Sequence, residues 1–287
     1  MVIPVHDKNP VRRVPVVTYA LIAVCAVVFL AGPISGFLPF YGSGRGLLCE
    51  QNAYLARWGV IPDELWHGPL PAALIPTPAG CPAPHGYSKV PVLSVLTALF
   101  VHGSWLHLLG NMLFLYVFGD NIENRMGRVR YLLFYLVAGY LATYGYALVH
   151  ADSAQSLVGA SGAISGALGS YLYLYPRARV TSLFPFLFFL PLRLPAWAVL
   201  SFWFVLQWLA AQASPPGPAV AYAAHIVGFA FGFLCTWVCF RRKPGRAGPE
   251  PARPEPSAPG AGPSFDGPSK LSGDPAPGAT NQGDPQP

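Results

Sequence analysis

The segment LVGASGAISGALGSYLYLY, Leu157–Tyr175, decides the fold class of this chain. It is about as long as a helix that crosses the hydrocarbon core of a membrane, roughly 20 residues, and it carries no charged side chain. Gly162 and Gly166 stand four residues apart, so they share one face of this helix and allow a second helix to approach closely. The segment therefore predicts a membrane-spanning helix with Ser161 near one end.

Five further segments of the chain meet the same criterion. The six predicted spans are Val14–Ala31, Val92–Phe118, Tyr131–Val149, Leu157–Tyr175, Ala196–Ala213 and Ala219–Phe240. The apolar stretch Leu183–Leu192 is too short to span and contains two prolines, so we expect it at the membrane interface or in a re-entrant loop. With 53% hydrophobic and only 10% charged residues, and a mean hydropathy of +0.42, the chain is predicted to be an all-α integral membrane protein.

The distribution of Lys and Arg predicts the orientation of the spans. Basic residues cluster on the side that holds both termini, which is therefore predicted to be cytoplasmic: Lys8, Arg12, Arg13, Arg125, Arg128, Arg130, Arg177, Arg179, Arg193, Arg241, Arg242, Lys243 and Arg246. The opposite side has only Arg45, Arg57 and Lys89. Because no basic stripe is interleaved with aromatic residues, the net charge of +6 does not indicate nucleic-acid binding.

The chain divides into three predicted parts. Residues 1–13 form a short cytoplasmic tail, residues 14–240 form the membrane domain, and residues 241–287, rich in Pro and Gly, form a disordered cytoplasmic tail. The extracytoplasmic loop, residues 32–91, contains Cys49 and Cys81. An oxidising compartment permits a disulfide between these two, and free thiols are the alternative.

Few strongly polar side chains fall within the predicted spans, and each is a candidate functional group because a polar group in lipid is costly. They are His102, His107 and Asn111 of the second span, Ser161 of the fourth, Gln207 of the fifth and His225 of the sixth. For any single one, a hydrogen bond that only supports helix packing is the alternative. Gly228 and Gly232, which follow His225, favour a catalytic role over packing alone, because they and the glycines of the fourth span would let the two helices approach.

Such an approach would bring a serine hydroxyl and an imidazole within hydrogen-bond reach. In Gly159-Ala160-Ser161-Gly162 the hydroxyl has small neighbours at a helix amino terminus, where free N–H groups favour a developing anion. No Asp or Glu lies within a span, so Ser161 and His225 would form a dyad. His107 and Asn111 share one helical face and can supply N–H donors for an oxyanion hole, whereas His102 points elsewhere and suits a structural role.

Other chemistries lack the residues that they need. The chain has no HExxH motif, and the spacing of His102 and His107 does not place two metal ligands on one helical face. It has no pair of intramembrane aspartates, no phosphate-binding glycine motif, and no internal repeat of the kind that transporters show. We therefore expect neither a metal nor an organic cofactor.

Four strings together resemble the rhomboid family of intramembrane serine proteases, over about Thr18–Phe240: HGSWLHLLGN (His102–Asn111), ENR (Glu123–Arg125), GASG (Gly159–Gly162) and AHIVGFAFG (Ala224–Gly232). Their order, spacing and positions on the second, fourth and sixth spans carry the resemblance. It implies Ser161 as nucleophile, His225 as general base, Asn111 and His107 as the oxyanion-stabilising pair, His102 as the outer histidine of that motif, and Glu123 and Arg125 as a structural element.

One position departs from the family pattern. Some bacterial members have an aromatic residue four positions after the nucleophile that stacks on the base, and here that position is Ser165. Other contacts must then orient His225, and Tyr222 and Phe229 on its own helix are candidates.

The resemblance implies cleavage of transmembrane protein substrates near the outer face of a lipid bilayer. The compact six-span plan and the absence of a transit-type leader favour a bacterial cell membrane as the expected location. A substrate helix must unwind before its amide reaches Ser161, so small or helix-breaking residues near the scissile bond should favour cleavage. Two alternatives are a non-catalytic rhomboid-like protein that binds and escorts membrane clients, and a small multispan transporter or channel.

Overall fold

The computed structural model describes residues 3–9, 13–84, 87–184, 190–213 and 221–240. Its longer helices are α1 (Val16–Ala31), α2 (Gly44–Trp58), α5 (Trp105–Phe114), α7 (Arg128–Val149), α8 (Ser161–Leu174), α9 (Ala196–Ala213) and α10 (Tyr222–Cys239). Shorter helices are α3 (Pro62–His67), α4 (Pro91–Ala98) and α6 (Asp120–Met126), with 3-10 turns at Pro33–Ser35, Pro39–Tyr41 and Ala72–Leu74. The predicted tail, residues 241–287, lies outside the described residues.

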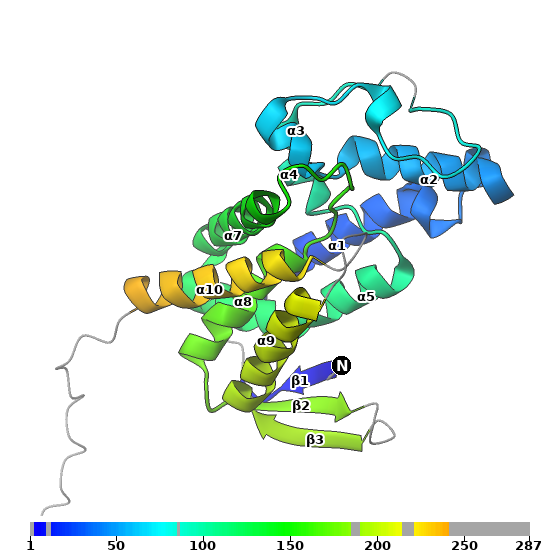
Figure 1. Ribbon diagram of the computed structural model, residues 1–287. Helices are drawn as coiled ribbons and strands as arrows, with labels where there is room; N and C mark the ends of the chain where they lie inside the picture. Colours follow the sequence, from blue (N-terminus) through cyan, green and yellow to red (C-terminus); the bar gives the residue numbers. More distant parts are fainter. Residues whose placement is uncertain (1–2, 10–12, 85–86, 185–189, 214–220, 241–287) are drawn as a thin grey trace, which may run out of the picture. The chain divides into compact units, whose positions relative to one another are not determined.

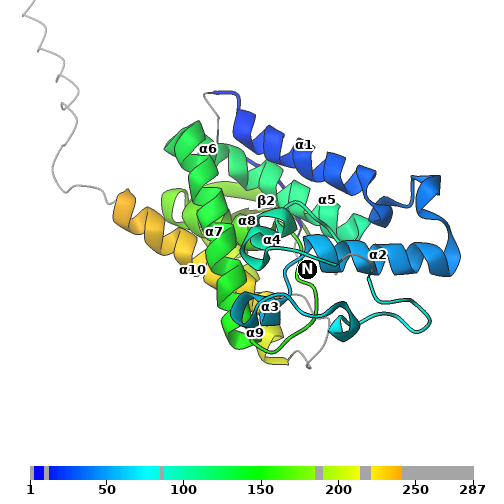
Figure 2. The ribbon, with the colours of Figure 1, turned by 90° about the horizontal axis from the view of Figure 1, so that it is seen from above.

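Helix α8 is the centre of the helical bundle, packed against α10, α7, α9 and α5 (Figures 1 and 2). Ten consecutive residues of it, Gly162–Tyr171, are buried. Its small residues explain the close packing: a Cβ atom at Gly228 would overlap the carbonyl oxygen of Gly162, and one at Gly232 would overlap that of Gly166. Backbone therefore meets backbone along the α8–α10 contact, where neither helix could carry a larger side chain.

The second predicted span is not one helix. Residues Val92–Phe118 are divided between α4, a loop at residues 99–104, α5 and a π-helical turn at Leu115–Gly119 that leads into α6. The extended residue Ser104 starts α5, because its side chain accepts a hydrogen bond from the backbone N–H of His107 (3.1 Å). Hydropathy missed this break because the first half of the loop, Leu99, Phe100 and Val101, is apolar.

A small sheet corrects the all-α prediction, although the chain is mostly helical. Strands β1 (Ile3–Asp7), β2 (Arg179–Phe184) and β3 (Leu190–Pro195) pair antiparallel in the order β1-β2-β3 (Figure 1). Within the stretch Leu183–Leu192, which we expected at the interface or in a re-entrant loop, Leu183 and Phe184 end β2 and Leu190–Leu192 begin β3; residues 185–189 lie outside the described residues. The N-terminal strand adds to this hairpin through long-range pairing, which local sequence patterns do not reveal.

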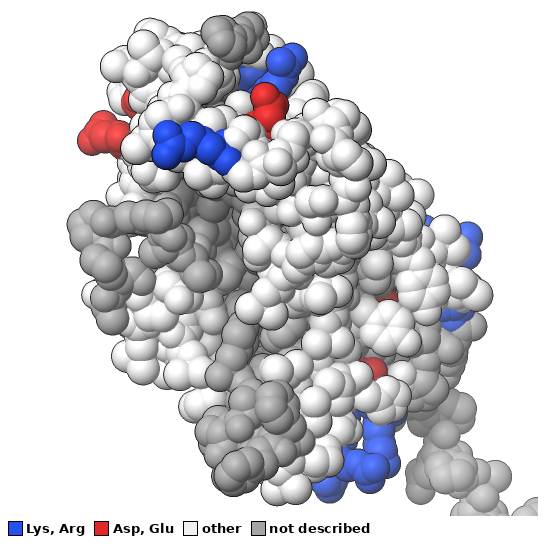
Figure 3. Space-filling model, turned by 90° about the vertical axis from the view of Figure 1, so that its right-hand side faces the viewer, with Lys and Arg blue, Asp and Glu red and all other residues white. Residues whose placement is uncertain are grey.

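Length alone does not establish six spans. Among the described helices, α7 and α10 are long and apolar enough to cross a membrane, while α1 and Ala196–Ala210 of α9 are shorter apolar helices. One face of the protein, shown in Figure 3, carries Lys and Arg near its upper and lower ends and at one edge, and most of that face is uncharged.

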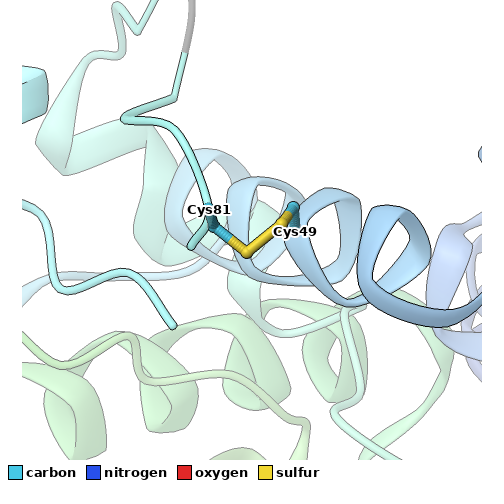
Figure 4. The surroundings of a disulfide bond; sticks show 2 residues. All are labelled: Cys49 and Cys81. Carbon is cyan, nitrogen blue, oxygen red and sulfur yellow. A yellow bond between two sulfur atoms is a disulfide. The ribbon is translucent and has the colours of Figure 1, made fainter. Parts of the chain in front are cut away.

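The segment between α1 and α4 is held together by a disulfide and a buried ion pair. Cys49 of α2 is joined to Cys81, with Cα atoms 5.4 Å apart (Figure 4). Lys89 Nζ lies 2.6 Å from a carboxylate oxygen of Glu64 and also donates to the carbonyl groups of Ala56 and Gly59 at the end of α2. Burial lowers the pKa of Lys89, and the neighbouring Glu64 carboxylate opposes that shift.

This segment also contacts the loop that precedes Ser161. Val60 and Leu157 exchange two backbone hydrogen bonds, of 2.9 and 2.6 Å, in an isolated antiparallel bridge. The N–H of Asp63 donates to the carbonyl of Ser153 in the same loop (3.2 Å). The disulfide-linked segment therefore holds one side of the α7–α8 loop.

Candidate active site

Ser161 and His225 form a hydrogen-bonded pair. Ser161 is the first residue of α8 and His225 lies in the first turn of α10, 64 residues later, with Ser161 Oγ 2.8 Å from His225 Nε2. The glycine contacts of α8 and α10 make this distance possible, because they place the two helix starts side by side. His225 is 7% exposed, so the imidazole is largely shielded from solvent.

The backbone before Ser161 has a conformation that favours glycine. Gly159 has a φ of +118°, which a residue with a side chain adopts only under strain. Its N–H donates to the carbonyl of Ala98 (2.9 Å), so the last residue of α4 fixes the approach to α8. Ser161 then stands at the start of a helix, where the first N–H groups have no intrahelical partner.

Two side chains of α5, His107 and Asn111, lie next to Gly159. A Cβ atom on Gly159 would lie 2.6 Å from His107 Nε2 and 3.5 Å from Asn111 Nδ2, so both groups are adjacent to the residues that lead into Ser161. Asn111 Nδ2 is buried and has no hydrogen-bond partner among the residues that the structure describes. An unpaired buried donor costs free energy, and a group that becomes charged nearby would satisfy it.

His102 packs beside this pair. Its ring centroid lies 5.1 Å from that of His107, and its Nδ1 lies 3.3 Å from the carbonyl oxygen of Phe100. It is 1% exposed, and within the described part of the chain its Nε2 has no hydrogen-bond partner. The side chain therefore helps to order the loop between α4 and α5.

The second nitrogen of His225 has a partner that the sequence did not suggest. His225 Nδ1 lies 2.8 Å from Oε1 of Gln207, a buried residue of α9. The Trp203 ring, one turn earlier on α9, lies 6.0 Å from the imidazole, and Tyr222 meets it edge-on at 6.3 Å. Phe229 packs against Trp203 and Phe204 instead. The only signal in the sequence was that Gln207 is a strongly polar residue in an apolar span.

Ser165, at the position where some relatives carry an aromatic residue, points back along its own helix. Its hydroxyl donates to the carbonyl of Ser161 (2.7 Å).

A cavity of about 20 Å³ borders Ser161, between Gly159, Leu157, Thr143 and Ala221. This is room for about one water molecule.

Glu123 and Arg125 lie away from this site and serve different partners. The Glu123 carboxylate accepts hydrogen bonds from the N–H groups of Val17 and Thr18 and from the Thr18 hydroxyl, at 2.8–3.0 Å. It therefore satisfies free donors at the start of α1. The Arg125 guanidinium lies over the Phe240 ring at 5.4 Å.

A family model described as the rhomboid domain matches residues 91–242, which include all of these site residues. The chain belongs to the rhomboid family. Rhomboid proteins are integral membrane proteins with several spans, and most are serine proteases, although some members are inactive.

Three relatives show how far the similarity extends. The chain is 32% identical over 149 residues to "Rhomboid protein 1, mitochondrial" of Saccharomyces cerevisiae, which covers 50% of this chain and 41% of the yeast protein. It is 28% identical over 155 residues to "Putative rhomboid protease YdcA" of Bacillus subtilis, covering 53% and 69% of the two chains. It is 44% identical over 71 residues to "Rhomboid-like protein 11, chloroplastic" of Arabidopsis thaliana, covering 25% of each. These relatives come from organelles as well as from a bacterium.

Proposed function

We propose that this protein is an intramembrane serine endopeptidase that cleaves transmembrane substrates with a Ser161–His225 dyad. The observation that carries the proposal is the 2.8 Å contact between Ser161 Oγ and His225 Nε2 at the adjacent starts of two helices. Membership of a family whose members are mostly serine proteases supports it. Nucleophilic catalysis by a serine and a histidine requires no cofactor.

The reaction would proceed in two stages. His225 Nε2 accepts the Ser161 hydroxyl proton while Oγ attacks the scissile peptide carbonyl, and the imidazolium then protonates the leaving amine. Water, deprotonated by the same nitrogen, hydrolyses the acyl-enzyme and regenerates the serine. The negative oxygen of each tetrahedral intermediate would accept hydrogen bonds from the Ser161 N–H, Asn111 Nδ2 and His107, which the unpaired Asn111 donor supports.

We also propose that the membrane domain, residues 14–240, spans the bilayer six times with both termini cytoplasmic. Outward-facing apolar side chains on α1, α5, α7 and α9 would then contact lipid; Val27, Leu106, Val129, Leu148 and Trp208 are among those that are half or more exposed. Helix α8 is shorter than a full span and is enclosed by its neighbours. Ser161 would therefore lie below the outer face, reached from the extracytoplasmic side. The bacterial cell membrane remains our expected location, and residues 241–287 our expected disordered tail.

Substrate choice would depend on how easily a helix unwinds. The test is cleavage of a single-span substrate in proteoliposomes by the native protein, Ser161→Ala and His225→Ala. The proposal predicts cleavage by the native protein only, and a large decrease when Gly or Ala near the scissile bond is replaced by Leu. Cleavage by Ser161→Ala would contradict it. A folded native protein that binds the substrate without cleaving it would favour the alternative, a rhomboid-like protein that escorts membrane clients.

A further inference from the structure

Gln207 is a buried polar residue in an apolar helix. It is 8% exposed, and its neighbours on α9 include Trp203, Leu206 and Trp208. A side-chain amide in such a place is costly unless it is hydrogen-bonded. The amide oxygen meets this requirement through the Nδ1 of His225, at 2.8 Å.

This contact determines which nitrogen of His225 carries the proton. An amide oxygen can only accept a hydrogen bond, so the contact with Gln207 Oε1 requires a proton on Nδ1. A neutral imidazole then has an unprotonated Nε2, and that nitrogen is the one that faces Ser161 Oγ at 2.8 Å. The acceptor on α9 thus selects the tautomer in which the imidazole can act as a base toward the serine.

From this geometry we propose that Gln207 is a positioning residue for the reaction, a neutral third member that orients His225 and fixes its tautomer. The inference rests on the proposed function. Gln207 occupies the role that a carboxylate has in a triad, but without placing a second buried charge beside the imidazole. In the attacking step it would also accept a hydrogen bond from the imidazolium that forms.

Helix α9 supplies the aromatic contact to His225 that, in some bacterial members of the family, comes from a residue four positions after the nucleophile. Trp203 and Gln207 are four residues apart and so share one face of α9, and both meet the His225 ring. The start of α9 is fixed by backbone hydrogen bonds from Ala196 to Ala178 (2.8 Å) and from Trp197 to Pro176 (2.9 Å). Ser165 is therefore not needed to orient His225, and its hydroxyl instead donates to the carbonyl of Ser161 in its own helix.

The test compares three variants of the full chain with the native protein. Gln207→Met keeps the length of the side chain and removes the acceptor, whereas Gln207→Glu keeps an acceptor oxygen in either protonation state. Gln212→Met is the matched control, because Gln212 is an exposed residue of the same helix. The measurements are the rate of labelling by a fluorophosphonate probe, kcat and KM for a peptide in lipid, and the unfolding temperature.

We expect Gln207→Met to lower the labelling rate and kcat by about ten- to a hundredfold, as loss of one hydrogen bond to a charged group does, with KM and the unfolding temperature near native values. Gln207→Glu should recover most of the rate, and Gln212→Met should equal the native protein. Unchanged labelling and kcat in Gln207→Met would overturn the inference. So would an equal loss in Gln207→Met and Gln207→Glu with a lowered unfolding temperature, because that indicates packing alone. Ser161→Ala separates the two ideas: labelling that survives it overturns the proposed function itself.

Discussion

At the scale of single residues, the proposed nucleophile and base are in contact, whereas a proposed oxyanion donor has no partner among the described residues. Ser161 and His225 are already in hydrogen-bond contact, whereas Asn111 Nδ2 is buried and unpaired. In the proposed mechanism, this unpaired donor gains its hydrogen bond when the substrate oxygen becomes negative. This difference is what lowers a barrier, because the interaction is stronger in the transition state than in the ground state.

Replacing Asn111 should therefore affect the chemical step. We expect Asn111→Ala to lower kcat by about 10²- to 10³-fold with little change in KM, the effect of losing one oxyanion donor. Asn124→Ala, on the half-buried surface of α6, is the control and should keep native kinetics. Steady-state cleavage of a peptide in lipid measures both, and an Asn111 variant with native kcat would exclude the residue from the oxyanion site.

A second residue-scale prediction concerns pH. Burial raises the pKa of Asp120 from 3.8 to about 6, against the hydrogen bonds from Asn121. Because the folded protein favours the protonated form, this group stabilises the fold below about pH 4, and that contribution is lost as the pH rises through about 6. We expect the unfolding temperature to fall between about pH 4 and pH 7, and Asp120→Asn to reduce the fall. Asp152→Asn, an exposed control, should leave it unchanged, and equal falls in both variants would disprove the assignment.

At the scale of elements, the glycines of α8 and α10 set the distance on which the site depends. A methyl group at Gly228 would overlap the Gly162 carbonyl, so we expect Gly228→Ala to force the helices apart, to destabilise the protein by about 1–3 kcal/mol and to abolish probe labelling. Gly110→Ala in α5 is the matched control, since a Cβ atom there meets nothing within 4 Å. Thermal unfolding and labelling compare the two, and normal labelling in Gly228→Ala would show that the close approach is not required.

The disulfide-linked segment permits a separate prediction. The Cys49–Cys81 bond closes a loop of 32 residues, whose closure entropy corresponds to about 3–4 kcal/mol of stability. We expect Cys49→Ser with Cys81→Ser to lower the unfolding temperature and, through the Val60–Leu157 bridge, to loosen the loop before Ser161 and reduce kcat. Cys239→Ser, which removes an exposed free thiol, is the control. A double variant with native stability would contradict this account.

The helices that enclose the site could be predicted from hydropathy, and the small-residue spacing correctly indicated which two would touch. The span Ala196–Ala213 matches α9 at both ends. The sequence could not show the break between α4 and α5, because an apolar loop has the hydropathy of a helix, nor the β1–β2 pairing, because its partners lie far apart in the chain. It also could not assign Gln207 to His225, because residue spacing can indicate which helices approach each other but not which polar side chains on them meet.

At the scale of the whole molecule, the positions of the basic residues predict that the disulfide-linked segment and the two termini lie on opposite sides of the membrane. We expect Ser43→Cys in the predicted extracytoplasmic segment to react with a membrane-impermeant maleimide on intact cells of an expression host. Arg177→Cys, at the predicted cytoplasmic side, should react only after permeabilisation. Both substitutions are made at exposed positions in a Cys239→Ser background, which removes the exposed free thiol. The reverse pattern of labelling would overturn the orientation and the outer location of Ser161.

Reaction of the purified protein with a fluorophosphonate probe tests whether His225 activates Ser161. We expect the native protein to be labelled and Ser161→Ala and His225→Ala not to be, with all three folded by thermal unfolding. Labelling that persists in either variant, or a folded native protein that neither reacts with the probe nor cleaves a peptide in lipid, would contradict it.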